Sequence, residues 1–117
     1  MTETAYPVEL LLPSGRRLHL LVSSTDYILT AAYQAALDLP SLCLQGWCVT
    51  CAGRVLGGGD WNQSDSRRYY PEDRAAGFIL LCTARPRSPL VIATHQGAAM
   101  RAHRIRLGLP VPGRLIE

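Results

Sequence analysis

Hydrophobic residues are concentrated in short runs along the first part of the chain. Residues 8–12 and 17–22 are rich in Val and Leu, and a Pro-Ser-Gly sequence separates them. Short apolar runs joined by turn-forming residues predict the two strands of a hairpin. A helix is predicted next, with Asp26 as its N-cap and Pro40 at its end. Helical spacing places four residues of this helix toward the core: Ile28, Ala32, Ala35 and Leu39.

The rest of the chain predicts three more short strands and two more helices. The strands are expected at 52–56, in the FILLC run and in the PLVIATH run, and a short helix is expected to begin at Pro71. A last helix is predicted over 98–107, with Gly108 as its C-terminal cap. One main helix and a mixed sheet indicate an α+β fold.

Four cysteines carry the candidate chemistry. Cys43, Cys48 and Cys51 are separated by four and two residues, and Cys82 follows after thirty more. The beginning of the chain resembles no secretory signal, and a cytoplasmic location is expected. In a reducing compartment, clustered cysteines bind metal more often than they form disulfides.

Three kinds of site compete for these thiols. A structural zinc site usually has two Cys-x-x-Cys pairs, whereas this chain has one, Cys48 and Cys51. A thioredoxin-like redox pair would leave Cys43 and Cys82 without a role. The third possibility is a [2Fe–2S] cluster, for which Cys-x4-Cys-x2-Cys followed by a distant cysteine is a known spacing. The spacing favours the cluster.

Composition and charge further limit the classes of protein to which the chain can belong. The chain has 117 residues and is 48% apolar, which argues for one folded domain. No apolar run reaches the roughly 20 residues of a membrane span. Residues 98–117 contain four arginines and one acid, and residues 1–97 contain eight basic and eight acidic residues, so the net charge of +3 lies in the tail. We therefore divide the chain into a domain, 1–97, and a basic C-terminal extension, 98–117.

Several motifs resemble plant-type ferredoxins, the small electron carriers of chloroplasts and oxygenic photosynthetic bacteria. The stretches DYILTAA, LDLPSLC, CAGRV, QSD, GFILLC and VIATH occur in the order of that family, over roughly residues 5–96. The resemblance implies a β-grasp fold, a single [2Fe–2S] cluster and one-electron transfer at low potential. It also implies the ligands: Cys43 and Cys48 on the more exposed iron, and Cys51 and Cys82 on the other.

The resemblance implies redox proteins as partners, namely reductases or ferredoxin-dependent enzymes, with photosystem I as a candidate. Typical members are acidic and dock against basic reductases, but here Tyr33 and Gln34 stand where acids are expected. A conventional ferredoxin–NADP reductase is therefore expected to be a poor partner. Four arginines in the tail without a nucleic-acid-binding fold are weak grounds for such a ligand, and no nucleic acid is expected.

The combined prediction is an accessory electron carrier with altered partner choice and no enzymatic activity. A sensor module, in which cluster occupancy sets the fold and the tail contacts a partner, is the alternative. Several local expectations follow. Thr50 is the hydroxyl expected beside the ligands, Gly46 and Gly53 are expected to allow close approach of the backbone to the cluster, and His95 is expected in the core.

Overall fold

The sheet and helices form in the predicted order. A computed structural model describes residues 4–37, 39, 50–66 and 68–109. The two predicted strands of the hairpin, the three later strands and the three helices are all present in this part of the chain. Their bounds are β1 (Ala5–Leu11), β2 (Arg17–Ser23), α1 (Ile28–Gln34), β3 (Ala52–Leu56), β4 (Trp61–Asn62), α2 (Pro71–Ala75), β5 (Phe78–Leu80), β6 (Arg85–Pro86), β7 (Leu90–Ala93) and α3 (Gly97–Leu107).

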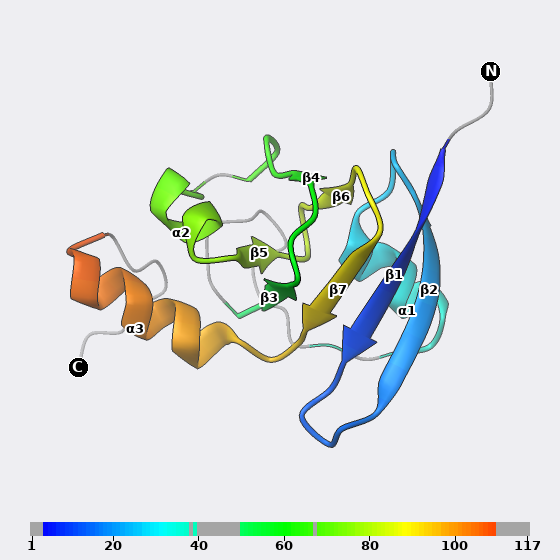
Figure 1. Ribbon diagram of the computed structural model, residues 1–117, viewed down its shortest axis with the longest axis horizontal. Helices are drawn as coiled ribbons and strands as arrows, with labels where there is room; N and C mark the ends of the chain where they lie inside the picture. Colours follow the sequence, from blue (N-terminus) through cyan, green and yellow to red (C-terminus); the bar gives the residue numbers. More distant parts are fainter. Residues whose placement is uncertain (1–3, 38, 40–49, 67, 110–117) are drawn as a thin grey trace.

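Five strands form one mixed sheet in the order β2-β1-β7-β3-β5. The central strand β7 is parallel to its neighbour β1, and every other neighbouring pair is antiparallel. Figure 1 shows α1 lying against the sheet beside the β1–β2 hairpin, and α3 at the opposite end of the molecule. This arrangement is the β-grasp architecture of the α+β class, as predicted.

Two short strands were missed by sequence reasoning. β4 and β6 pair with each other as a separate two-stranded ribbon, in which Trp61 lies opposite Pro86. Each strand contains two residues, too few to produce a hydrophobic alternation. The ribbon holds together the two segments on either side of α2 and β5.

Helix α1 begins and ends differently from the prediction. Its N-cap is Tyr27 and not Asp26, and no side chain caps it. The helix ends at Gln34, well before Pro40, and Ala36 adopts a left-handed backbone with φ of 64°. Ala35 is consequently exposed, which contradicts its predicted place in the core.

The hydrophobic core lies between the sheet and α1. Among the predicted positions, Ile28, Ala32 and Leu39 are buried. Gly53 in β3 is required by packing, because a Cβ there would lie 2.7 Å from Ile92 Cγ2 and 3.0 Å from the Ala93 carbonyl oxygen, and its expected role beside the cluster stays a prediction. The close approach at Gly53 is therefore between β3 and β7, two neighbouring strands of the sheet.

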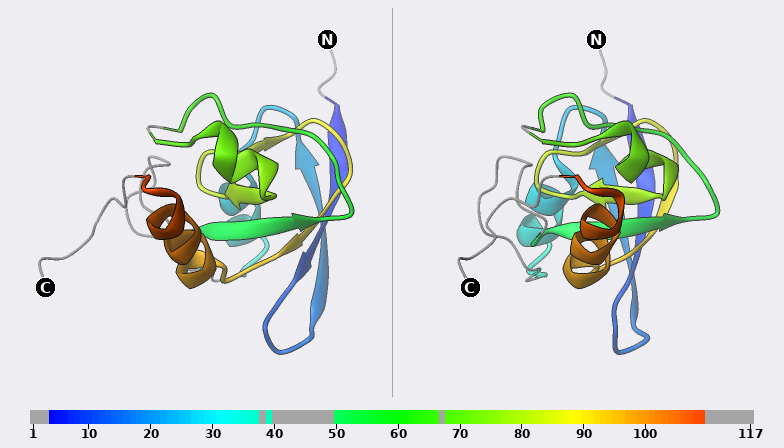
Figure 2. Two further views of the ribbon diagram at one scale, coloured as in Figure 1. Left: turned by 60° about the vertical axis from the view of Figure 1, so that its left-hand side comes forward. Right: turned by 90° about the vertical axis from the view of Figure 1, so that its left-hand side faces the viewer.

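Helix α3 packs against α2 and β3 through one face (Figure 2). Met100 on this face is fully buried, whereas Leu107 is 49% exposed. The fully buried Arg104 and the buried His103 occupy the contact instead. Gly108 ends the helix with φ of 73°, as predicted for a C-terminal cap.

Arg104 is held by Asp73 of α2, which is also fully buried. Arg104 Nη2 donates to Asp73 Oδ2 at 2.9 Å, and Arg104 Nε donates to Asp73 Oδ1 at 3.3 Å. Arg104 Nη2 also donates to the carbonyl of Arg68 at 3.0 Å. This two-point pairing joins the last helix to the rest of the chain. None of the helices in the described residues is both long and apolar enough to cross a lipid bilayer.

Candidate metal centre

Two of the four predicted ligands meet in the described part of the chain. Cys51 precedes β3 and Cys82 follows β5, and both side chains are buried. Their sulfur atoms are 3.2 Å apart. The other two predicted ligands, Cys43 and Cys48, and the expected Gly46 lie outside the described residues.

The backbone around these two cysteines is fixed by hydrogen bonds from three elements. The antiparallel register of β3 and β5 places Ala52 opposite Leu80, and the Leu81 amide donates to the Cys51 carbonyl at 3.3 Å. Helix α1 adds two bonds, because the Ile28 amide donates to Ala84 and the Leu29 amide donates to Leu81. These contacts satisfy helix donors that a side-chain cap would otherwise satisfy.

The turn that carries Cys82 is therefore clamped between the sheet and the helix. Its position depends on backbone contacts that join segments more than fifty residues apart, from α1 to the end of β5. A fixed ligand that arrives from the sheet suits a rigid metal centre, because the ligand geometry is set before the metal binds.

The sulfur pair fits two ligands of one metal atom. A disulfide bond would require about 2.05 Å, well below the observed 3.2 Å. Two thiolates in tetrahedral positions at about 2.3 Å from a metal lie about 3.8 Å apart, so a small opening of the pair admits the metal. Cys51 and Cys82 are the two cysteines that the resemblance places on the same iron. Soft thiolate ligands in a buried site suit iron–sulfur chemistry.

A second hydroxyl beside the ligands was missed by sequence reasoning. Thr83 follows Cys82 directly, is buried, and has its Oγ1 3.9 Å from Cys82 Sγ. The same Oγ1 lies 2.6 Å from Ser66 Oγ. Thr50, the hydroxyl that was expected, is half-buried before Cys51. Inspection of the residue that follows each cysteine would have revealed Thr83.

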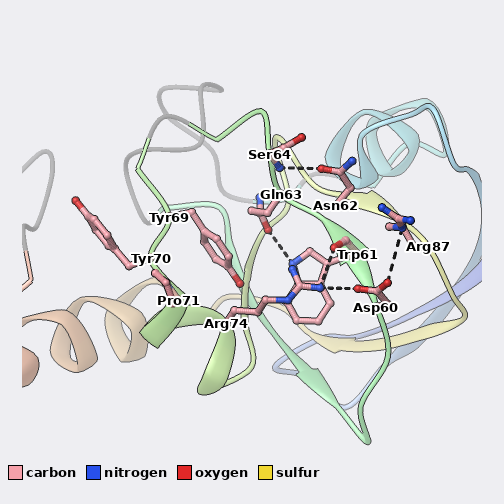
Figure 3. Close-up of a pocket in the computed structure, with 10 residues that line it drawn as sticks. All are labelled: Asp60, Trp61, Asn62, Gln63, Ser64, Tyr69, Tyr70, Pro71, Arg74 and Arg87. Atoms are coloured by element: carbon pink, nitrogen blue, oxygen red, sulfur yellow. Dashed lines mark hydrogen bonds and ion pairs between the residues drawn. The ribbon is translucent and has the colours of Figure 1, made fainter.

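A pocket of about 620 Å³ lies between β4 and α2. Figure 3 shows Arg74 stacked on Trp61, with the guanidinium carbon 4.1 Å from the ring centroid, and paired with Asp60. The indole nitrogen of Trp61 donates to Gln63 Oε1 at 3.0 Å. Burial raises the pKa of the Tyr69 hydroxyl, which donates to the Phe78 carbonyl. These contacts fix the loop from which Ser66 extends.

Several charged groups near the surface of the described residues form ion pairs. Arg85 lies 2.6 Å from Asp65, and Arg87 lies 3.7 Å from Asp60. The Asp65 carboxylate also accepts a hydrogen bond from Tyr27, which raises the pKa of the tyrosine. Arg17 donates to Glu9 and lowers the pKa of that carboxyl. Arg85 and Arg87 therefore contribute less free positive charge than the sequence suggests.

One histidine differs from its predicted position, and another that had no predicted role is buried. His95 is exposed and has φ of 60°, so its expected place in the core is wrong. Its Nδ1 lies 2.8 Å from Thr94 Oγ1, within hydrogen-bond distance. His103, which sequence reasoning left unassigned, is buried with its ring 5.1 Å from that of Phe78.

Comparison with known proteins identifies the family. Residues 12–87 match the family described as the 2Fe-2S iron-sulfur cluster binding domain, and this range includes all four cysteines. The chain is 41% identical to ferredoxin-2 of Synechococcus sp. over 91 residues, which cover 78% of this chain and 85% of the relative. It is 35% identical to the chloroplastic ferredoxin-6 of Zea mays over 91 residues, which cover 78% of this chain and 58% of the relative.

A solved structure supports the same assignment at the level of the fold. The crystal structure of pectocin M2 superposes with a TM-score of 0.70 and 26% identity, over 80% of this chain and 34% of that protein. The chain thus spans about a third of this larger protein. Because the family match covers more than half of the sequence, the chain belongs to the plant-type [2Fe–2S] ferredoxins, electron carriers that hold a single [2Fe–2S] cluster and exchange electrons with other redox proteins.

Proposed function

We propose that this chain is an accessory low-potential ferredoxin whose cluster is held by Cys43, Cys48, Cys51 and Cys82. The observation that carries the ligand assignment is the buried pair of sulfur atoms, 3.2 Å apart, contributed by two different segments. When bound, the cluster supplies a site that gains and loses one electron. Plant-type clusters have potentials of about −400 mV, and we propose the same range here.

The protein contributes a rigid and largely dry environment for that electron. Cys51 and Cys82 are buried, and the clamped turn at Cys82 restricts movement of the ligands. A site that does not reorganise when its charge changes favours rapid transfer, and hydrogen bonds to the sulfur atoms adjust the potential. We propose no catalytic step on a substrate, since the role of the chain ends with the transfer of the electron to a docked protein.

Partner choice is the feature in which this chain departs from typical members. Its net charge is +3, and Tyr33 on α1, where the family carries acids, is exposed and donates its hydroxyl to the Leu39 carbonyl. Helix α1 therefore offers a basic reductase no acidic side chains with which to form ion pairs. We propose that the natural partners present acidic or neutral docking surfaces, and photosystem I stays a candidate among the donors.

Electron transfer to a conventional ferredoxin–NADP reductase is expected to be at least about tenfold slower than from an acidic ferredoxin at low ionic strength. Added salt is expected to slow the acidic ferredoxin and to leave this chain unchanged or faster, because salt screens repulsion as well as attraction. Stopped-flow measurement of reductase flavin reduction between about 10 and 200 mM salt tests this prediction.

A charge variant provides the matched control. Arg106 on α3 is exposed, and Arg106→Glu lowers the net charge of the chain by two, from +3 to +1. The variant should react faster with the same reductase at low salt. Equal rates for this chain and an acidic ferredoxin, with the same decrease on addition of salt, would contradict the proposed partner specificity.

The carrier is distinguished from a sensor by the stability of the cluster during turnover. We propose that the chain is a cytoplasmic protein with a domain, 1–97, and an extension, 98–117. Arg104 and Met100 of the extension are buried, which supports an extension that packs on the domain and does not signal to a partner. A carrier should keep its visible spectrum through repeated cycles of reduction and anaerobic reoxidation. Loss of the cluster in air, accompanied by release of α3 in hydrogen exchange, would support the sensor instead.

A further inference from the structure

A continuous set of buried hydrogen bonds connects the tryptophan of β4 to the sulfur of Cys82. Gln63 is at its centre: its Oε1 accepts from the Trp61 indole and from the Leu80 amide. Its Nε2 lies 2.8 Å from Ser66 Oγ and 3.3 Å from Thr83 Oγ1. Trp61, Gln63 and Thr83 are all buried. Buried polar side chains that form a complete network rigidify their surroundings and polarise one another.

The donor and the acceptor of each hydrogen bond in this network can be assigned. The indole of Trp61 is a donor only, so Gln63 Oε1 must accept and Gln63 Nε2 must donate. The two hydrogens of Nε2 are donated to the Leu80 carbonyl at 2.9 Å and to Ser66 Oγ at 2.8 Å, which fixes the orientation of the amide, and the 3.3 Å contact to Thr83 Oγ1 shares one of these hydrogens. A thiolate at Cys82 accepts only, so the hydroxyl of Thr83 donates to Sγ. The hydroxyl of Ser66 then donates to Thr83 across 2.6 Å.

We infer that Thr83 is a positioning residue whose hydroxyl donates to the Cys82 thiolate and raises the reduction potential of the bound cluster, with Gln63 and Ser66 orienting it. This inference rests on the proposed ligand role of Cys82. Reduction adds negative charge that the ligand sulfurs share. A donor aimed at one of these sulfurs stabilises the reduced form more than the oxidised form.

The surroundings of Thr83 strengthen this effect. The hydroxyl is buried beside the sulfur, where water does not compete for the hydrogen bond and the local dielectric is low. The Thr83 backbone is also fixed, because its amide donates to the Leu80 carbonyl at 3.2 Å. The side chain therefore keeps its direction in both oxidation states without a rearrangement of the turn.

The test is the reduction potential of three variants of the holoprotein, measured by redox titration with spectroscopic detection. Thr83→Val keeps the branched shape and removes the hydroxyl. It is expected to lower the equilibrium constant for reduction about tenfold, which corresponds to about 59 mV for one electron. Thr83→Ser is expected to restore the wild-type potential. Ser66→Ala should shift the potential in the same direction by less, because the Gln63 Nε2 hydrogen that Ser66 accepts in wild type becomes free to be donated to Thr83 Oγ1, 3.3 Å away.

Ser64→Ala is the matched control, because Ser64 is exposed in the same loop and outside the network. A second measurement is the hyperfine coupling of an exchangeable proton near the reduced cluster, recorded by pulsed EPR in H₂O and D₂O. This coupling should be present in wild type and Thr83→Ser and absent in Thr83→Val. A merely structural role of Thr83 would not produce this difference.

Unchanged potentials in Thr83→Val and Ser66→Ala, with an intact cluster, would overturn the inference and leave the electron carrier unaffected. Failure of the wild type to take up one electron reversibly would instead contradict the proposed function. If Thr83→Val does not retain a cluster, Ser66→Ala decides: a potential equal to that of wild type and Ser64→Ala overturns the inference, and a more negative potential supports it.

Discussion

Cys82→Ala is expected to abolish binding of the cluster, with bound iron per chain falling more than about tenfold. Cys82 contributes the one ligand that is not in the 43–51 stretch, and its turn is fixed by α1 and β3. Alanine removes the thiolate and leaves one iron without its fourth ligand. Neither a backbone carbonyl nor water is a soft ligand that could replace it. Iron and sulfide content together with the visible absorption spectrum measure the effect.

Cys51→Ala should give the same result, because the two sulfurs form one pair. The control is Thr83→Ser, which changes the neighbouring residue and keeps both ligands and the hydroxyl. This control should contain the same amount of iron and sulfide as wild type. A Cys82→Ala protein with the iron and sulfide content of wild type would exclude Cys82 as a ligand, and with it the proposed set of four cysteines.

Asp73→Ala is expected to destabilise the protein by about 3–5 kcal/mol, the usual cost of removing one partner from a buried ion pair. Asp73 and Arg104 are fully buried, so the substitution leaves a guanidinium without its counter-charge. It also removes the acceptor of the Tyr70 amide at the start of α2. In urea, the midpoint for loss of tryptophan fluorescence and of visible absorption should fall by about 1–5 M.

Asp60→Ala is a matched control for this prediction. Asp60 also pairs with arginines, with Arg74 at 2.6 Å and Arg87 at 3.7 Å, but its side chain is exposed. Exposed pairs contribute about 0–1 kcal/mol. The double variant Asp73→Leu with Arg104→Met should recover most of the stability, because apolar residues replace both charges. A midpoint for Asp73→Ala equal to that of Asp60→Ala would contradict the proposed role of the buried pair.

The family and the order of the main helices and strands along the chain could be predicted from the sequence because they depend on local patterns. Cysteine spacing depends directly on the ligand geometry of the cluster. Short apolar runs separated by turns predict strands even when the neighbouring strands in the sheet are not known. The positive φ of Gly108 follows from the residue type at a helix end. The meeting of Cys51 and Cys82 agrees with the resemblance that assigned both to one iron.

The remaining differences arise from contacts between distant segments. Asp26 has the chemistry of an N-cap, but the first amides of α1 find carbonyls of the 81–84 turn instead. Arg104 was counted among the unpaired charges of the tail, but it pairs with Asp73, 31 positions earlier. No local sequence pattern indicates that these two residues interact. Thr83 and Gln63 belong to one network that only the packed structure brings together. Local sequence propensity does not predict contacts between residues that are far apart in the sequence.

The most direct test of the account is one quantitative analysis of the purified holoprotein for iron, acid-labile sulfide, zinc and electrons accepted. We expect a red-brown protein with two iron atoms and two sulfides per chain, no zinc, and reversible uptake of one electron. A colourless protein, a protein containing zinc without iron, or a cluster that takes up no electron would contradict the account.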